Sequence, residues 1–273
     1  MRPIWLLPLV LGACTTAASP TPSPVPAPSP APQATAPAAA APAPDPGGRV
    51  DRPSLLASGR PPQALHWTRS SAEHRAILLQ SYRLAGQRLR ELAASQQRGG
   101  WAVVMDADET VLDNSLYFQR QAERGYLNFT ANWPDFVREA IAPALPGALE
   151  FTRLVRELGG RIVIVTNRAE NLCGDTRRNL DNAGVSVDAV LCRPPGSEDK
   201  NPRFAAVQQG TVPGLPAMRV VMWVGDNIQD FPALTQAQAV AAPDAAYAEF
   251  GRSWWILPNP IYGSWERSPL PGR

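Results

Sequence analysis

The chain has 273 residues and a formal net charge of only +2, enough for one sizeable domain with additions at its ends. So small a charge argues against a nucleic-acid polymer as a partner. The two histidines, His66 and His74, lie in no Arg-His-Gly motif, and no Gly-x-Ser-x-Gly elbow is present. Neither Cys173 nor Cys192 is followed by arginine after five intervening residues. With histidine, serine and cysteine nucleophiles excluded, carboxylates remain as the expected chemical groups.

The first fourteen residues have the pattern of a secretory signal peptide. Arg2 precedes an apolar run of about eight residues, which is too short to cross a bilayer, since a span needs ~20. The run ends in Leu11-Gly12-Ala13-Cys14, which resembles a bacterial lipobox. The resemblance implies that Cys14 is lipidated and anchors the protein in the cell envelope. Because Thr15 follows rather than aspartate, the expected destination is the outer membrane, facing the periplasm.

Residues 15–60 form a segment rich in alanine, proline, serine and threonine. Its hydrophobicity is too low to offset the entropy of ordering, so we expect it to be disordered. Prolines bias such a chain toward extended conformations. The segment is therefore predicted to be a tether that holds a catalytic domain, residues 61–267, away from the membrane. Residues 268–273 are a short tail.

An amphipathic helix is expected at the start of the domain. Ser70 and Glu73 have the spacing of a capping box. Apolar residues then recur at spacings of three and four, and Gly99-Gly100 ends the pattern. We interpret His74, within this helix, as a surface residue rather than a ligand. The apolar face comprises Leu78, Tyr82, Ala85, Leu89 and Leu92.

The rest of the domain alternates short apolar runs with helical patterns. Strands are predicted at residues 101–105, 161–165, 188–192, 219–224 and 254–257. Helices are predicted from Pro146 to Leu158 and over residues 172–182. This alternation is typical of an α/β fold with a doubly wound parallel sheet. The connection between the first two strands is far longer than a crossover needs, so residues 113–145 are expected to form a cap insertion.

Polar residues follow the ends of the predicted strands. In such sheets, ligands bind beyond the carboxyl ends of the strands, so these side chains are expected to meet in one crevice. Carboxylates that repel one another are tolerated when a cation lies among them, and oxygen ligands favour Mg²⁺ in phosphate chemistry. An aspartate there could attack phosphorus, while a second carboxyl transfers protons. The residues concerned are Asp106, Asp108, Thr166, Asn167, Lys200, Asp226 and Asp230.

Four motifs carry a family resemblance. They are residues 106–115 (DADETVLDNS), 166–168 (TNR), 225–231 (GDNIQDF) and 257–266 (LPNPIYGSWE). Over residues 65–267 the chain resembles the class C acid phosphatases of the haloacid dehalogenase (HAD) superfamily, which are bacterial lipoprotein phosphatases and 5′-nucleotidases. The resemblance implies a HAD-like fold with an added N-terminal helix. It is also compatible with a homodimer.

The resemblance assigns roles residue by residue. Asp106 is expected to be the nucleophile and a ligand of Mg²⁺, and Asp108 the general acid and base. The backbone carbonyl of Asp108 and the Asp226 carboxylate would complete the protein ligands, with Asp230 supporting them. The expected phosphate-binding residues are Thr166, Asn167 and Lys200, although residues 193–199 before Lys200 depart from the family pattern.

The substrate is expected to be a small phosphomonoester, in particular a nucleoside 5′-monophosphate. Tyr117 closely follows the catalytic motif, and Tyr262 lies in a glycine-interrupted loop that resembles the substrate loop of the family. An aromatic pair could hold a base by stacking. Two alternatives stay open: a phosphotransferase that uses the same residues, and a non-catalytic lipoprotein that binds nucleotides or haem. The presence of both Asp106 and Asp108 argues against the second.

Two cysteines remain after Cys14. An oxidising compartment permits a disulfide between Cys173 and Cys192, which fall near the same edge of the predicted sheet. We favour this bridge over two buried thiols.

Overall fold

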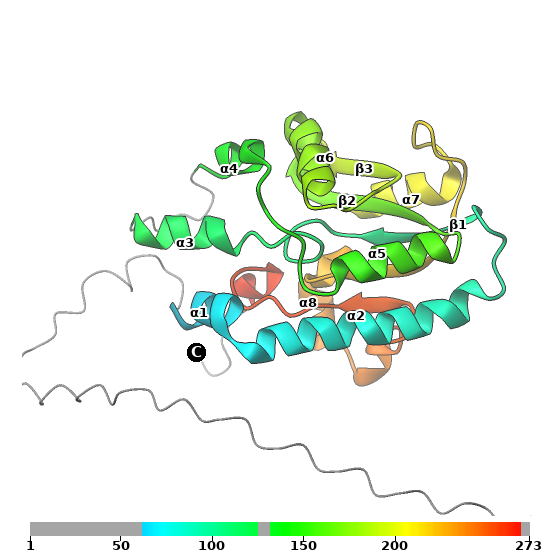
Figure 1. Cartoon of the computed structure of the whole chain (residues 1–273). Coiled ribbons are helices and arrows are strands. Elements are labelled where there is room, and N and C mark those ends of the chain that lie inside the picture. Colours follow the sequence, from blue (N-terminus) through cyan, green and yellow to red (C-terminus); the bar gives the residue numbers. More distant parts are fainter. Residues whose placement is uncertain (1–61, 125–131, 269–273) are drawn as a thin grey trace, which may run out of the picture. The chain divides into compact units, whose positions relative to one another are not determined.

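The computed structural model describes residues 62–124 and 132–268 (Figure 1). The predicted signal peptide, the lipidation site Cys14 and the tether lie outside the described residues, as do part of the cap and nearly all of the tail. No helix among the described residues combines the length and the apolar character needed to cross a membrane.

Five parallel strands form one sheet in the order β3-β2-β1-β4-β5. All five lie where the sequence predicts strands, and β2 continues beyond its predicted end. Parallel strands buried on both faces need no alternation of polar residues, which is why they are visible in the sequence as apolar runs. Their bounds are β1 Trp101–Met105, β2 Arg161–Ala169, β3 Ala189–Arg193, β4 Arg219–Gly225 and β5 Trp254–Ile256.

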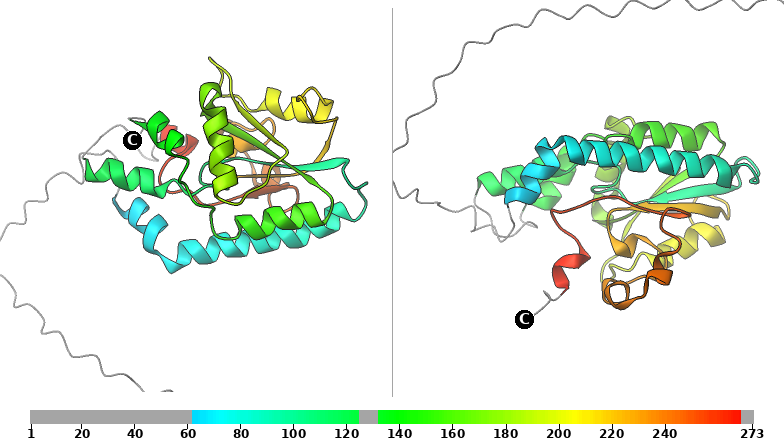
Figure 2. Two further views of the ribbon diagram at one scale, coloured as in Figure 1. Left: turned by 45° about the horizontal axis from the view of Figure 1, so that its top comes forward. Right: turned by 90° about the horizontal axis from the view of Figure 1, so that it is seen from below.

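Helices cover both faces of the sheet, as expected for a doubly wound fold. On β1, Trp101, Val103 and Met105 pack with residues of α2, α5 and α6. Ala102 and Val104 point the other way and pack with α7. Figure 2 shows α2 and α5 on one side of the sheet and α7 on the other. The bounds are α2 Ala72–Ala93, α5 Ala148–Glu157, α6 Cys173–Asn182 and α7 Asn201–Gln209.

The N-terminal addition consists of two helices, α1 Pro62–Ser70 and α2, where the sequence predicts one. The predicted capping box is wrong by one residue: Ser71 is the N-cap, and its hydroxyl accepts a hydrogen bond from the His74 N–H at 3.0 Å. The surface prediction for His74 is also wrong. Its side chain is buried, and its Nδ1 lies 2.7 Å from the Thr68 carbonyl oxygen, which ties the two helices together.

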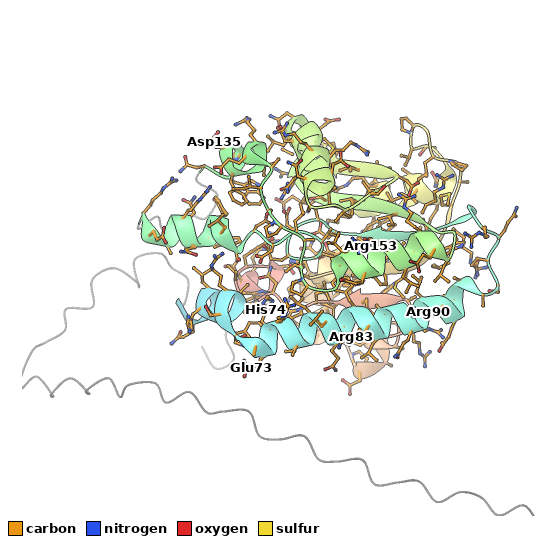
Figure 3. All side chains as sticks on the ribbon, viewed as in Figure 1. Glu73, His74, Arg83, Arg90, Asp135 and Arg153 are labelled. Carbon is orange, nitrogen blue, oxygen red and sulfur yellow. A yellow bond between two sulfur atoms is a disulfide. The ribbon has the colours of Figure 1, made fainter. Side chains whose placement is uncertain are left out.

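Helix α2 is amphipathic as predicted. Leu78, Tyr82 and Leu89 are buried against the sheet, whereas Arg83 and Arg90 are exposed on the outer side (Figure 3). This burial provides the stability of the helix, since propensity alone stabilises isolated helices only marginally. The helix therefore adds a layer to one face of the sheet.

The insertion after β1 contains α3 Ser115–Glu123 and α4 Trp133–Glu139. Side-chain amides of α6 hold the chain just after α4: Asn179 donates to the Ala142 carbonyl at 2.8 Å and Asn182 to the Ala140 carbonyl at 3.0 Å. The chain then returns to α5. The insertion thus begins at the carboxyl end of β1, where a cap is expected.

The disulfide between Cys173 and Cys192 is present and confirms the prediction. It joins the first residue of α6 to β3, an edge strand of the sheet. The chain after β4 contributes α8 Gln236–Ala241. Short 3₁₀-helices within the described residues are η1 Glu170–Leu172, η2 Ile228–Asp230, η3 Asp244–Tyr247 and η4 Ser264–Arg267.

Candidate active site

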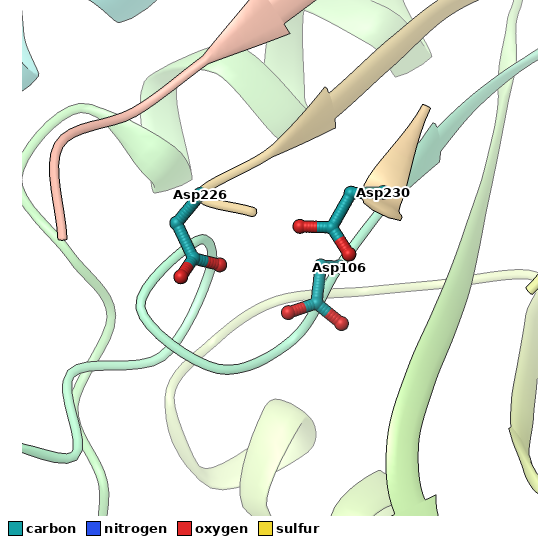
Figure 4. Close-up of side chains that lie close together, drawn as sticks. All are labelled: Asp106, Asp226 and Asp230. Atoms are coloured by element: carbon teal, nitrogen blue, oxygen red, sulfur yellow. The ribbon is translucent and has the colours of Figure 1, made fainter. Parts of the chain in front are cut away.

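The carboxylates gather at the point where the strand order reverses. From β1 the chain adds β2 and β3 on one side and β4 and β5 on the other, so the carboxyl ends of β1 and β4 border a crevice. Asp106 directly follows β1, and its N–H donates to the Val224 carbonyl of β4 at 2.9 Å. Asp226 directly follows β4, and Asp230 ends η2. Figure 4 shows the three carboxylates facing one another.

Carboxylate oxygens of Asp106, Asp226 and Asp230 all lie within 4.8 Å of one another. Burial, together with the negative charges of Asp230 and Asp108, raises the pKa of Asp106 to about 7, against the opposing effect of Lys200. Burial, and then the charges of Asp230 and Asp106, raises the pKa of Asp226 well above its usual range. The cluster is therefore held together against its own electrostatic repulsion.

Lys200 is the cation within this cluster. Its Nζ donates to Asp106 Oδ1 at 2.5 Å and to Asp230 Oδ1 at 2.7 Å, and the side chain is only 4% exposed. Burial alone would lower the pKa of Lys200, but the two carboxylates outweigh it and raise the pKa. Lys200 contacts two of the three carboxylates and carries a single positive charge, so the cluster keeps an excess of negative charge that a divalent cation could balance. The carboxylate oxygens of Asp106, Asp226 and Asp230 suit Mg²⁺ or a similar hard ion.

Neighbouring groups orient the Asp226 carboxylate. Thr110 Oγ1 donates to its Oδ1 at 3.1 Å, and Asn259 Nδ2 donates to its Oδ2 at 2.8 Å. Asp230 Oδ2 accepts the Asn227 N–H at 2.9 Å. Gly225 makes this packing attainable, because a Cβ at that position would lie 2.3 Å from the Cβ of Asp230. The orientations of Asp226 and Asp230, the candidate ligands after β4, are thus set by residues near the end of β4, by the loop after β1 and by the segment after β5.

Asp108 lies apart from this cluster. Its Oδ1 accepts hydrogen bonds from Arg168 Nε at 2.9 Å and from Asn114 Nδ2 at 2.8 Å, and Arg168 Nη2 lies 2.8 Å from the same oxygen. The Arg168 side chain is completely buried. No role was predicted for Arg168 or Asn114, although both lie within the quoted motifs 166–168 and 106–115. The only signal in the sequence is the alternation of side chains along a strand, which places Arg168 on the same side of β2 as Thr166.

The loop between Asp108 and α3 is tied to distant elements. Glu109 has a φ of 51°, in the left-handed region that costs a side chain energy. Burial, and then the charge of Asp108, raises the pKa of Glu109 to about 8, and Tyr262 Oη donates to its carboxylate. Tyr82 Oη of α2 donates to the Thr110 carbonyl at 2.6 Å. The added helix and the C-terminal segment therefore both support this loop.

The predicted phosphate-binding residues of β2 lie at the same edge. Thr166 is completely buried, and its Oγ1 accepts the Arg168 N–H at 3.1 Å. Asn167 Nδ2 donates to the Glu198 carbonyl at 3.0 Å, and its Oδ1 accepts from Arg203 Nη2 at 2.6 Å. Asn167 lines the cavity described below, whereas Thr166 lies beneath its surface. Arg203 is a buried support that the sequence analysis missed.

A cavity of about 580 Å³ opens over the aspartates. Asp106, Asp108, Lys200 and Asp226 form its floor. Tyr117 and Tyr262 both line this cavity, and each ring packs on Phe118, with ring centroids 5.2 and 5.3 Å away. The sequence analysis did not single out Phe118 or Trp133 as wall residues. The lining also includes Asn167, Arg168, Arg193, Glu198, Asn227, Gln229, Asp230, Gly263, Ser264, Glu266 and Arg267.

Comparison with known proteins decides the family. Residues 60–265 match the family model described as HAD superfamily, subfamily IIIB (acid phosphatase). The chain belongs to this family.

Two solved structures support the assignment. The class C acid phosphatase from Bacillus anthracis with tungstate bound is 29% identical, with a TM-score of 0.68, over 78% of this chain and 88% of that one. A second structure of the class C acid phosphatase from Bacillus anthracis is 28% identical, with the same TM-score and coverage. The chain is accordingly an acid phosphatase of the HAD fold, a hydrolase of phosphoric monoesters.

The family assignment gives the acidic cluster of this acid phosphatase a chemical meaning. HAD phosphatases generally use a divalent metal ion, and the cluster of Asp106, Asp226 and Asp230 could hold one. The structure adds Asp230 to the ligand candidates, where the sequence analysis gave it a supporting position.

Proposed function

We propose that this acid phosphatase hydrolyses phosphomonoesters through an aspartyl-phosphate intermediate on Asp106. A carboxylate oxygen of Asp106 attacks phosphorus, and the bond from phosphorus to the leaving oxygen breaks as Asp108 gives that oxygen a proton. Asp108 then takes a proton from the water that attacks the intermediate, which releases phosphate and regenerates Asp106. The main observation behind this proposal is that both carboxylates line one cavity while each is paired with a different cation. Asp106 is paired with Lys200, and Asp108 is paired with Arg168.

Mg²⁺ is the proposed cofactor. Asp106 and Asp226 would hold it with the Asp108 carbonyl, and Asp230 is close enough to take part or to support them. The ion supplies positive charge that offsets the repulsion between Asp106 and an anionic phosphoryl group. Lys200 contributes a fixed positive charge on the same side. Asn167, which lines the cavity, is proposed to bind the phosphoryl oxygens from the end of β2, and the buried Thr166 is proposed to support it.

Nucleoside 5′-monophosphates are the proposed substrates. Tyr262, which is half-buried, gives the cavity wall aromatic surface, and base stacking on such surfaces tolerates many bases. Tyr117 is also in the lining, but its side chain is only 1% exposed, so the stacking proposal rests mainly on Tyr262. The relative from Bacillus anthracis has been solved with tungstate, a tetrahedral oxyanion like phosphate. A site for such an anion beside aromatic side chains suits a phosphate group joined to a flat base.

The proposed location is the periplasmic side of the outer membrane, with lipidated Cys14 as the anchor and residues 15–60 as the tether. The disulfide between Cys173 and Cys192 supports an oxidising compartment. Replacing Cys14 by serine should move the protein from the membrane fraction to the soluble periplasm. Unchanged fractionation would contradict the anchor. A homodimer is compatible with this arrangement.

The test of the mechanism uses a substrate labelled in its phosphoryl group. Acid quenching during turnover should trap the label on Asp106, and Asp106→Asn should trap none. Label on another residue, or no label at all, would contradict the nucleophile. Free phosphate is measured in the same experiment with and without an added alcohol. Transfer of the label to the alcohol would favour the phosphotransferase alternative, and binding without any release of phosphate would favour a non-catalytic protein.

A further inference from the structure

Arg168 is a buried guanidinium to which the mechanism above gives no catalytic step. It lies near the carboxyl end of β2, where the pairing with β3 shifts register between Val165 and Ala169. Its side chain is completely buried, and removing an arginine from water is costly unless a carboxylate compensates. Among the described residues, the carboxylate paired with it is Asp108.

The contacts on Asp108 are unequal between its two oxygens. Oδ1 accepts two hydrogen bonds, from Asn114 Nδ2 at 2.8 Å and from Arg168 Nε at 2.9 Å, and Arg168 Nη2 forms an ion pair with the same oxygen at 2.8 Å. Oδ2 receives only a longer contact, from Arg168 Nε at 3.3 Å. An oxygen that accepts two hydrogen bonds and contacts a third N–H group of a cation has no room for a proton of its own. The proton of the neutral carboxyl group therefore belongs on Oδ2.

The guanidinium is itself held on further sides. Arg168 Nη2 donates to Asn114 Oδ1 at 3.2 Å, so Asn114 contacts both members of the pair. The ring of Trp133, from α4 of the insertion, lies with its centroid 5.4 Å from the Arg168 guanidinium carbon. Arg168 cannot swing away from Asp108 without losing these contacts.

We propose that Arg168 is a positioning residue, which fixes the Asp108 carboxyl group so that Oδ2 exchanges the proton with the leaving oxygen and with the attacking water. The inference rests on the proposed function, because it needs Asp108 as acid and base. Arg168 stays protonated throughout, and the proton moves only between Oδ2 and the substrate or water. A lysine would supply the charge but not the planar pair of donors.

The test varies the need for a proton while keeping the substrate shape similar. Benzyl phosphate releases an alkoxide that must be protonated, whereas 4-nitrophenyl phosphate releases a stable phenolate. In Arg168→Lys and Arg168→Gln, kcat/KM for benzyl phosphate should fall about 100-fold or more, the scale of general acid catalysis. For 4-nitrophenyl phosphate, kcat/KM should fall less than about tenfold.

A second readout uses the hydrolysis half of the reaction. With 4-nitrophenyl phosphate, the same variants should show lower kcat and lower KM together, with a burst of nitrophenol, because the intermediate accumulates when water is poorly deprotonated. A residue that merely stabilised the fold would not produce this burst. Circular dichroism identifies the variants that are folded. Trp133 is half-buried, and Trp133→Leu removes its contact with Arg168, so this variant should show the same difference between the two substrates but a smaller one.

Two further variants separate the possible failures. Arg203→Lys alters another buried arginine at the same edge, which donates to the Thr166 carbonyl at 2.5 Å, and it should affect both substrates equally. Asp108→Asn should be selective for the leaving group if the proposed function is correct. If Asp108→Asn is selective but the Arg168 and Trp133 variants lower both substrates alike, the positioning role is overturned and the proposed function stands. If Asp108→Asn is not selective, the acid role of Asp108 itself fails.

Discussion

The two aspartates of the first motif lie in opposite electrostatic surroundings, although one residue separates them. We call Asp106, Asp226, Asp230 and Lys200 the acidic half of the site, and Asp108, Asn114 and Arg168 the guanidinium half. In the acidic half, three carboxylates face one ammonium group, and burial and repulsion raise the pKa of Asp106 to about 7. In the guanidinium half, one carboxylate faces one guanidinium.

The difference shows how a short motif can support two chemical tasks. The acidic half has excess negative charge, which a bound cation would offset. The guanidinium half is balanced in charge, and its hydrogen bonds fix the orientation of the Asp108 carboxylate. Replacements in the two halves should therefore have different consequences.

The largest effect is expected from Asp106→Asn in the acidic half. Turnover should fall by about four orders of magnitude, the scale seen when a catalytic unit loses one member. The fold should survive, because Lys200 keeps its partner Asp230 at 2.7 Å and the cluster loses a repelling charge. Steady-state kinetics and thermal unfolding check both statements. More than a tenth of wild-type activity in this variant would contradict the nucleophile assignment.

Removal of the cation should come next in effect. Chelation should abolish activity, and added Mg²⁺ should restore it. Because the ion would bind the folded state and relieve the acidic half, chelation should also lower the melting temperature of the wild-type protein. In Asp226→Asn, chelation should change both the activity and the melting temperature less than in the wild-type protein. In Arg168→Lys, chelation should still lower the melting temperature. Full activity after exhaustive chelation would rule out the metal requirement.

The aromatic wall should contribute less than either half of the site. Tyr262→Ala should raise KM for nucleoside monophosphates roughly tenfold, equivalent to ~1.4 kcal/mol, because a stacking surface is lost. KM for glycerol phosphate, which has no base, should hardly change. Tyr247→Ala is the matched control, since Tyr247 is 38% exposed and lies outside the cavity lining. Equal losses on both substrates would instead assign Tyr262 to support of the loop through Glu109.

The smallest effect is expected at Asp188, a carboxylate outside the site whose charge is compensated by two arginines. Burial alone would raise the pKa of Asp188, but the Ile162 N–H and the guanidinium groups of Arg161 and Arg156 outweigh it and hold the pKa below its usual range. A pKa lowered by folding stabilises the protein above the unfolded value of ~3.9, and this stabilisation is lost as the pH falls through the folded pKa.

Asp188→Asn should accordingly lower the free energy of unfolding by about 1 kcal/mol at neutral pH, since the guanidinium groups are partly exposed to solvent. Denaturant unfolding at neutral and strongly acidic pH measures the difference, which should shrink in acid. Asp135→Asn, whose ion pair with Arg138 is exposed, should change little at either pH. A difference that grows in acid would contradict the assigned direction of the pKa.

The sheet and the acidic half could be predicted from the sequence because both depend on local order along the chain. A buried apolar run predicts a strand, and a polar residue after such a run lies at the carboxyl edge of a parallel sheet, as Asp106 and Asp226 do. The disulfide followed from the same reasoning, because Cys173 and Cys192 flank one edge.

The guanidinium half was harder to predict, because it depends on where side chains point after regular structure ends. Arg168 lies within a quoted motif, yet it reaches Asp108 from a part of β2 where the regular pairing with β3 is interrupted. Two adjacent serines, Ser70 and Ser71, made the helix start ambiguous. His74 could have been identified as buried, since it precedes Leu78 by four residues on the same helical face.

Gly225 carries no functional group, yet the acidic half depends on its lack of a side chain. The smallest replacement would place a methyl group 2.3 Å from the Asp230 Cβ and 2.4 Å from its Oδ2. Asp230 would have to move, and with it the carboxylate that shares Lys200 with Asp106. In a saturation mutagenesis screen scored by activity, position 225 would therefore be as intolerant as the nucleophile, and intolerance alone would misidentify it as a chemical participant.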